Sequence, residues 1–401
     1  MSKNQTLWKR WGVGCAVLTS VAAGMVGCST EVDLTAPYDS IPVVYGLLEL
    51  EADTQWVKIN RTWLGEGNQL LAAQVADSSE YPAGSVDARI VELIPSSSGG
   101  IVGNELPTGR AWALRDTLID NKETSGIFFG PTQRVYYAAT TTEELRDDRL
   151  YRLELDLPDG KEARATTTMV ESSVGAINQP PPNLPNYKMG FAAVNPDGTA
   201  TYPNFPFKWT TSPGASLYTA SLVVHYEERY YADDALTLLD STRERTLTLS
   251  VGTREVNGLN GFQTIDEPFE CQRLFGELST RLEANPRIRR VLGRYDAEYQ
   301  MERAFDFVLQ VANQDLAIYL DVNETTNSVV QDRPTWTNIE VIGNDGTPMG
   351  GVGLWGSRST LGVYGLGYSK QTIQHLQEGD LTAALNFCSP APSGISDYSC
   401  E

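Results

Sequence analysis

Alternation of apolar and polar residues is the feature that most limits how this chain can fold. In its clearest form, apolar side chains occupy every second position from Tyr151 to Leu157, with charged residues between them. A period of two is typical of a half-buried strand. Pro158-Asp159-Gly160 then favours a turn, and residues 161–170 return the chain as a second strand. The pattern predicts a β-hairpin with one buried face.

Similar short runs recur through the first 177 residues, separated by turns rich in Gly, Pro and Ser. They are Val43–Leu48, Trp56–Arg61, Ser85–Leu93 and Arg134–Ala139. A succession of short strands joined by such turns is typical of a β-sandwich. We therefore predict a mainly β fold with an N-terminal β-sandwich domain over residues 43–177.

The second half of the chain predicts another β-sandwich-like domain, over residues 201–401. Residues 178–200 contain Pro180-Pro181-Pro182 and no periodicity, so we interpret them as a stiff linker. Strands are expected at Phe207–Trp209, Tyr218–Tyr226, Phe305–Val311 and Leu316–Val322. The first two, with the Pro-Gly-Ala turn between them, resemble the B and C strands of fibronectin type III-like and immunoglobulin-like modules.

Two segments of this second domain change to a helical period. Phe269, Leu274, Phe275, Leu278 and Leu282 are spaced for one buried stripe between Pro268 and Ala284. Lys370–Phe387 has the same character. We expect an inserted amphipathic helix and a C-terminal helix.

The N-terminus has the organisation of a signal peptide. Lys3, Lys9 and Arg10 precede a mostly apolar run, Trp11–Val26, which is shorter than the ~20 residues of a membrane span. Met25-Val26-Gly27-Cys28 closes this run and resembles the lipobox of bacterial lipoprotein precursors. The resemblance implies that residues 1–27 are removed and that Cys28 carries the lipid, including palmitate.

Two alternatives to lipidation stay open. Cleavage could follow a small-residue site such as Ala22-Ala23-Gly24, or the segment could remain as a membrane helix, which Thr19-Ser20 disfavours. Residues 28–42 are interpreted as an acidic tether that ends at Pro42. In Bacteroidota, acidic residues after the lipidated cysteine, here Glu31 and Asp33, resemble surface-export signals.

The charge balance excludes one class of partner. The chain has 31 Lys and Arg against 51 Asp and Glu, a net charge of −20. An acidic surface of this size disfavours nucleic acid and anionic lipid headgroups. It is compatible with cation binding or with a plainly solvated surface.

The cysteines fit an oxidising compartment. Cys15 lies in the signal peptide and Cys28 is assigned to lipid. Cys388 and Cys400 flank a Pro/Gly/Ser loop that could bring them together, so we predict a disulfide between them. The alternative is that Cys388 is buried and Cys400 frays. Cys271 is expected as a buried helix thiol, and no cysteine pair has zinc-site spacing.

Candidate catalytic chemistry is sparse. The only histidines, His225 and His375, lie in no ligand cluster or triad pattern. Residues 351–356 spell G-x-G-x-x-G but lack the strand-turn-helix context of a nucleotide loop, which favours a Gly-rich strand where backbones approach closely. Asp147-Asp148, Asp233-Asp234 and the Asp321 and Asp345 segments are interpreted as turns. We therefore expect no catalytic residue, metal or cofactor.

Aromatic and basic residues offer weaker hypotheses for binding. Exposed aromatics would make a glycan-binding or protein-binding surface, although core packing explains most of them. The candidates are Tyr226, Tyr230, Tyr231, Trp336 and Trp355. The basic run from Arg287 to Arg290 could meet an acidic partner or be solvated.

As a whole, the mature chain resembles Bacteroidota outer-membrane lipoproteins of unknown function that are often encoded beside TonB-dependent receptors. The residues that carry this resemblance are Cys28, Glu31–Leu34, Val43–Leu48, Val57–Arg61 and Gly351–Arg358. It implies a lipid-anchored, non-enzymatic accessory or binding protein at the outer membrane, on its cell-surface or periplasmic face, with an outer-membrane protein as partner. The alternative is a structural component of an adhesion, gliding or secretion apparatus.

Overall fold

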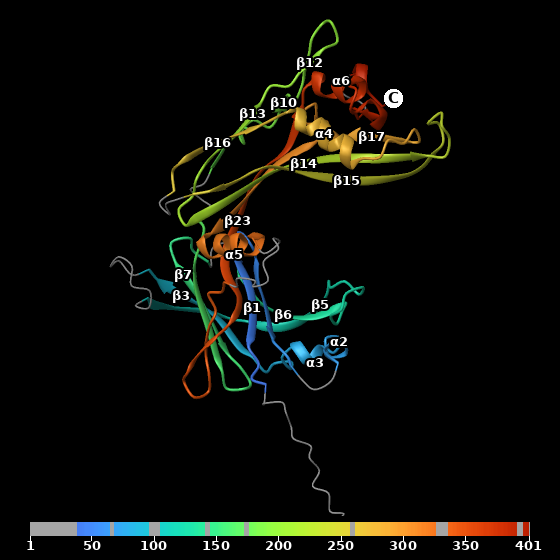
Figure 1. The fold of residues 1–401 in the computed structure, drawn as a ribbon. Coiled ribbons are helices and arrows are strands. Elements are labelled where there is room, and N and C mark those ends of the chain that lie inside the picture. Colours follow the sequence, from blue (N-terminus) through green and yellow to red (C-terminus); the bar gives the residue numbers. More distant parts are fainter. Residues whose placement is uncertain are drawn as a thin grey trace, which may run out of the picture.

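The computed structural model describes residues 38–64, 68–95, 105–140, 145–171, 176–256, 261–325, 336–390 and 396–400. The predicted signal peptide, Cys28 and most of the predicted tether lie outside these residues. The described chain is mainly β, which confirms the predicted fold class. Figure 1 shows two sandwich-like regions, one above the other, which we call the lower and upper sandwiches.

The lower sandwich consists of two facing sheets. The first contains β1 (Pro42–Glu49), β2 (Thr54–Arg61), β6 (Thr132–Ala139) and β5 (Arg115–Asp120), in this order. The second contains β22 (Pro348–Gly350), β21 (Glu340–Ile342), β8 (Glu162–Thr168), β7 (Leu150–Asp156), β3 (Asp87–Ile94) and β4 (Leu106–Ala113). The predicted hairpin is β7–β8, and Tyr151, Leu153 and Leu155 are buried as the alternation requires. Two short helices, α2 (Gln69–Ala72) and α3 (Ala76–Ser79), follow β2.

The upper sandwich continues the first of these sheets through one long strand, β23 (Val352–Tyr368). Beside it lie β20 (Phe305–Asn313), β14 (Ala215–Tyr231), β15 (Leu239–Glu255), β17 (Ile288–Leu292) and β24 (Phe387–Cys388). The facing sheet contains β9 (Ala176–Gln179), β13 (Phe205–Thr210) and β16 (Thr264–Phe269). Phe207 of β13 stacks on Phe307 of β20 at 4.4 Å between ring centroids, so the two sheets share one core.

Short strand pairs complete the upper region. They are β11 (Ala193–Val194) with β12 (Ala200–Thr201), β18 (Arg294–Asp296) with β19 (Met301–Arg303), and β10 (Lys188–Met189) with β23. Several of these lie within the predicted linker, whose role as a boundary stays a prediction.

Both predicted helices exist, in shorter form. α4 (Gln272–Arg281) buries Leu274, Phe275 and Leu278. α6 (Lys370–Glu378) begins after Ser369, whose side chain accepts a hydrogen bond from the backbone N–H of Thr372. Short 3₁₀ turns follow at Ala383–Leu385 and Ser396–Tyr398.

The prediction of a strand at Leu316–Val322 is wrong, because these residues belong to helix α5 (Gln314–Thr325). Leu316, Tyr319 and Leu320 are spaced at i, i+3 and i+4, so they share one helix face. Because α5 is only partly buried, polar and apolar residues are mixed along its sequence. Neither the helical period nor the strand period is therefore clear there. Figure 1 shows α5 at the level where the two sandwiches meet.

Strand β23 is part of both sandwiches. Its first half pairs in parallel with β1, from Val352 beside Val43 to Arg358 beside Glu49. Its second half pairs in antiparallel orientation with β20. Trp355 is buried in the lower core, where its Nε1–H donates to the Tyr151 carbonyl at 3.0 Å. Val363, Leu366 and Tyr368 are buried in the upper core.

The glycine-rich run at the start of β23 meets the backbone of β1 closely, as the sequence predicted. Gly353 has φ +120°, and a Cβ there would lie 1.7 Å from the Val44 carbonyl oxygen. Only glycine fits such an approach.

The lower core combines residues from two separate parts of the chain. Ile339, Val341 and Trp355 belong to the lower core together with residues 44–169. The sequence pattern predicts one domain for residues 201–401. The separation in sequence hides the return of residues 339–355 to the lower sandwich, because pairing with β8 and β1 is a long-range choice.

A polar cluster lies at the joint between the sandwiches. The Asn313 amide donates to Thr167 Oγ1 at 2.7 Å and to the Thr168 carbonyl at 3.2 Å. Asp315 accepts from Thr167 Oγ1 at 2.8 Å. Ser357 of β23 also donates to the Thr168 carbonyl, at 2.7 Å. These bonds tie β8, β20, β23 and the start of α5 together.

Asp315 provides a pH test of this joint. Burial raises the pKa of its carboxyl, although hydrogen bonds from Thr167 and Asn313 act to lower it. A raised folded-state pKa means that this group contributes stability below its unfolded pKa and loses that contribution as pH rises through the folded pKa. Asp315→Asn should therefore raise the unfolding temperature at pH 7, and the difference should vanish near about pH 4.

The control is Asp321→Asn on the exposed side of the same helix, which should leave the unfolding temperature unchanged at both pH values. A lower unfolding temperature for Asp315→Asn at pH 7 would show that the charged form is needed at the joint.

Candidate functional site

A charged groove of about 1050 Å³ opens on the upper sandwich. One wall comes from β14 and β15, and the other from the β18–β19 hairpin and the end of β23. About half of its lining residues are acidic or basic, and these are His225, Glu227, Arg229, Glu244, Arg245, Arg294, Asp296, Arg303 and Asp306. Of the lining residues, only His225 and Tyr226 were candidates in the sequence. Spacing alone did not show that these distant strands converge.

Three of the four carboxylates of the groove, those of Glu227, Glu244 and Asp296, pair with arginines. Arg229 Nε lies 2.6 Å from Glu227, and Arg303 Nε lies 2.5 Å from Asp296. Arg294 pairs with Glu244. The Arg303 partnership lowers the pKa of Asp296 below its usual value. A carboxylate held ionised by an arginine is a poor general acid.

His225 pairs with the remaining carboxylate of the groove, that of Asp306. Its Nε2 lies 2.7 Å from Asp306 Oδ2, and the other carboxylate oxygen accepts the backbone N–H of Gly365 at 2.7 Å. Asp306 is thus fixed by β23, and it orients the partly exposed imidazole towards the groove. Among the described residues, no group of three or more His, Cys, Asp or Glu side chains is placed to hold a metal.

Beneath the groove, Arg290 corrects the expectation of a solvated basic run. Its side chain is 2% exposed and pairs with Glu228 at 3.1 Å. It also donates to the carbonyls of Leu385 and Glu283. Glu228 in turn accepts from the Tyr230 hydroxyl at 2.7 Å. This buried pair fixes the part of β14 that forms the groove wall.

Replacing Arg290 should leave the buried carboxylate of Glu228 with fewer positively charged neighbours. We expect Arg290→Met to lower the free energy of unfolding by about 3 kcal/mol, the lower end for a broken buried pair, because Glu228 keeps Arg245 as a partner at 3.2 Å. Urea unfolding provides the measurement.

Arg294→Met is the matched control, since Arg294 and Glu244 are both largely exposed and such pairs contribute at most about 1 kcal/mol. Equal effects of the two substitutions would contradict a structural role for Arg290.

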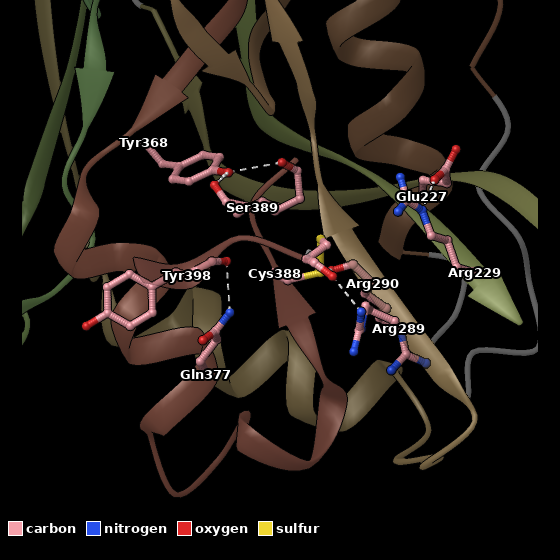
Figure 2. The surroundings of a disulfide bond; sticks show 11 residues. Glu227, Arg229, Arg289, Arg290, Tyr368, Gln377, Cys388, Ser389 and Tyr398 are labelled. Carbon is pink, nitrogen blue, oxygen red and sulfur yellow. Dashed lines mark hydrogen bonds and ion pairs between the residues drawn. A yellow bond between two sulfur atoms is a disulfide. The ribbon is translucent and has the colours of Figure 1, made fainter. Parts of the chain in front are cut away.

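The predicted cysteine pair is joined in the structure. Cys388 and Cys400 form a disulfide with an S–S distance of 2.08 Å, shown in Figure 2. Beside it, the Tyr368 hydroxyl bonds Ser389 Oγ at 2.6 Å, and Gln377 Nε2 donates to the Tyr398 carbonyl at 3.1 Å. The disulfide and these bonds hold the C-terminal segment against β17 and α6.

Cys271 and His375 are core-packing residues. Cys271 is a free, fully buried thiol at the start of α4, and burial raises its pKa to about 11. His375 bonds the Tyr202 hydroxyl at 2.8 Å and packs edge-on against Phe275. Burial lowers the pKa of His375. The Cys271 thiol is therefore a weak nucleophile and the His375 imidazole is neutral. Both lie in the upper core, away from the charged groove.

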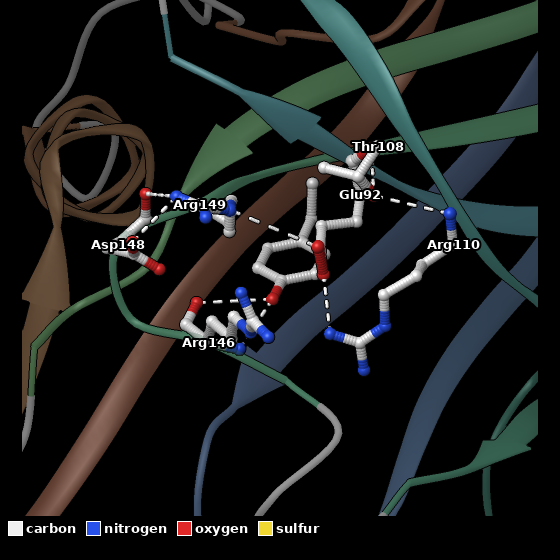
Figure 3. Close-up of polar contacts among 7 residues, drawn as sticks. Glu92, Thr108, Arg110, Arg146, Asp148 and Arg149 are labelled. Atoms are coloured by element: carbon white, nitrogen blue, oxygen red, sulfur yellow. Dashed lines mark hydrogen bonds and ion pairs between the residues drawn. The ribbon is translucent and has the colours of Figure 1, made fainter.

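A second buried charge cluster lies in the lower sandwich, shown in Figure 3. Glu92 is 1% exposed and accepts from Arg110 Nη1 at 2.9 Å, with Arg149 Nε at 4.0 Å. The hydroxyl of Tyr151 bonds the backbone of Arg146. Glu92 is thus a buried structural carboxylate that is paired with arginines.

Of the remaining sequence candidates, Asp233 and Asp345 lie in turns, whereas the turn predicted at Asp321 is wrong because Asp321 is part of helix α5. Asp233 accepts the backbone N–H of Leu238 at 2.7 Å, and Asp345 accepts that of Thr347 at 2.9 Å. Among the aromatic candidates, Trp355 and Tyr226 are buried.

Comparison with known proteins adds no family assignment. No protein-family model matches the chain, and no curated protein matches it. Among the described residues, none of the helices has the length and apolar character to cross a membrane.

Proposed function

We propose that the protein is a lipid-anchored accessory or binding protein of the bacterial outer membrane, attached through Cys28, which engages a partner protein through the charged groove. The partner that fits the sequence resemblance is a TonB-dependent receptor. The observation that carries the proposal is geometric: the end of the chain that leads to Cys28 and the charged groove lie at opposite ends of β23.

The lower end is fixed by Lys161. Its ammonium lies 2.5 Å from Asp39 and 2.8 Å from Asp159, and it donates to the Ser40 carbonyl at 2.7 Å. Burial acts to lower the pKa of Lys161, but the bonds and charges of Asp159 and Asp39 raise it overall. The chain before β1 is therefore held against the β7–β8 turn, at the bottom of Figure 1.

The upper end is set by the strand. β23 begins beside Val43, near the start of β1, and reaches the charged groove at Gly365. At about 3.3 Å per residue, this path is roughly 40 Å long. A lipid at Cys28 would therefore hold the lower sandwich near the membrane and present the groove away from it.

Anchoring is tested by labelling with palmitate in the native host. The wild-type chain should incorporate label and fractionate with the outer membrane, since two or more acyl chains give stable attachment. Cys28→Ser should lose the label, whereas Cys271→Ser should keep it, because that thiol is buried. Label that persists in Cys28→Ser would contradict the anchor.

Partner engagement is tested by purification from detergent-solubilised outer membrane. Arg294→Glu should reduce recovery of the partner, because it reverses an exposed charge in the groove. Arg89→Glu makes the same change on an exposed pair of the lower sandwich and should have no effect.

The identity of the recovered protein separates the two candidate functions. A TonB-dependent receptor supports an accessory role in uptake, and motility or secretion components support a structural role in a surface apparatus. Equal recovery with both charge reversals would contradict engagement through the groove.

A further inference from the structure

A second groove, of about 660 Å³, lies on the outer face of the lower sandwich. Its floor is the uncovered side of β1 and β2, with α5 along one margin and the end of β5 along the other. Its apolar lining includes the exposed Tyr45, Trp56 and Leu320 and the partly exposed Leu47, Ile119 and Tyr319. We call it the aromatic groove. It shares no lining residue with the charged groove.

The rings of the aromatic groove are held in place although they face solvent. Trp56 is 48% exposed and packs on Tyr137, with ring centroids 5.4 Å apart. Tyr45 is 39% exposed, meets Tyr319 edge-on at 6.0 Å, and its hydroxyl lies 3.5 Å from that of Tyr319. Burial and the neighbouring Tyr319 raise the pKa of Tyr45 to about 12, so its hydroxyl stays protonated. The floor thus combines fixed apolar ring surface with hydroxyl groups that donate and accept.

The charges around the groove already have partners inside the protein. Arg358 lies 3.3 Å from Glu49, and Lys58 lies 3.4 Å from Glu80 and donates to the Arg134 carbonyl at 2.7 Å. A charged ligand would have to compete with these pairs. The margin therefore suits a neutral ligand with hydroxyl groups.

The openness of the groove excludes a wholly apolar ligand. Pockets for such ligands enclose most of the ligand surface, whereas an occupant here keeps one side in water above the half-exposed Trp56. Sugar rings meet both conditions, since they have an apolar C–H face that stacks on aromatic rings and a hydrated rim of hydroxyls. From this geometry we infer that the aromatic groove binds a neutral glycan, with Trp56 as the stacking platform and Tyr319 as the adjacent wall.

The test uses the full chain, purified in a detergent without a sugar headgroup. Affinity electrophoresis in gels that contain a neutral soluble glucan, mannan, galactan or xylan should show retardation with at least one polymer. Trp56→Ala should weaken that binding at least about tenfold, as the loss of one stacking ring implies. Tyr319→Ala should also weaken it, and Trp56→Phe should keep part of it.

Tyr364→Ala is the matched control, because Tyr364 is 61% exposed on β23 and lies outside the groove. It should bind as the wild type does. Retardation by none of the four polymers overturns the inference, as does retardation that Trp56→Ala leaves unchanged. Partner recovery that depends on Trp56 without any glycan binding would assign the groove to a protein and also overturns it. The Arg294→Glu result is independent of all these outcomes.

Discussion

The rest of the structure depends on one strand that two hydrophobic cores share. β23 enters the lower core through Trp355 and the upper core through Val363, Leu366 and Tyr368. Its pairing passes from β1 to β20 at Arg358, which has a partner in both strands, so the ladder of hydrogen bonds runs through the joint without a gap. The close approach at Gly353 fixes its lower half, and the hydrogen bond from Ser357 to the Thr168 carbonyl fixes its middle. The relative position of the two sandwiches therefore follows from backbone pairing, with side-chain packing added to it.

Both grooves are lined in part by β23. The charged groove lies where the upper end of β23 meets β14 and the β18–β19 hairpin, and Gly365 holds Asp306 there. The aromatic groove lies beside the lower half of β23, where α5 follows the joint residue Asn313. The two grooves lie on different sandwiches, as our proposal of a partner protein at one and a glycan at the other requires.

Much of the local structure could be predicted from the sequence, because it depends on local rules. The β7–β8 hairpin follows from alternation and the Pro158-Asp159-Gly160 turn, and α4 and α6 follow from their apolar stripes. The period is weaker in α5, and its strand prediction failed. The two grooves were harder to predict from the sequence. Alternation says which side chains share a face of a strand, but whether another layer covers that face depends on distant parts of the chain. Trp355 is consequently core and Trp56 is surface, although neither could be assigned from its neighbours.

Native-state hydrogen exchange along β23 tests the shared strand most directly. Amides from Val352 to Tyr368 that pair with β1 or β20 should exchange slowly, and those near Arg358, where pairing passes from one partner to the other, should be as protected as those on either side. Fast exchange confined to the residues around Arg358 would contradict the account, because it would show two sandwiches that move independently about a hinge.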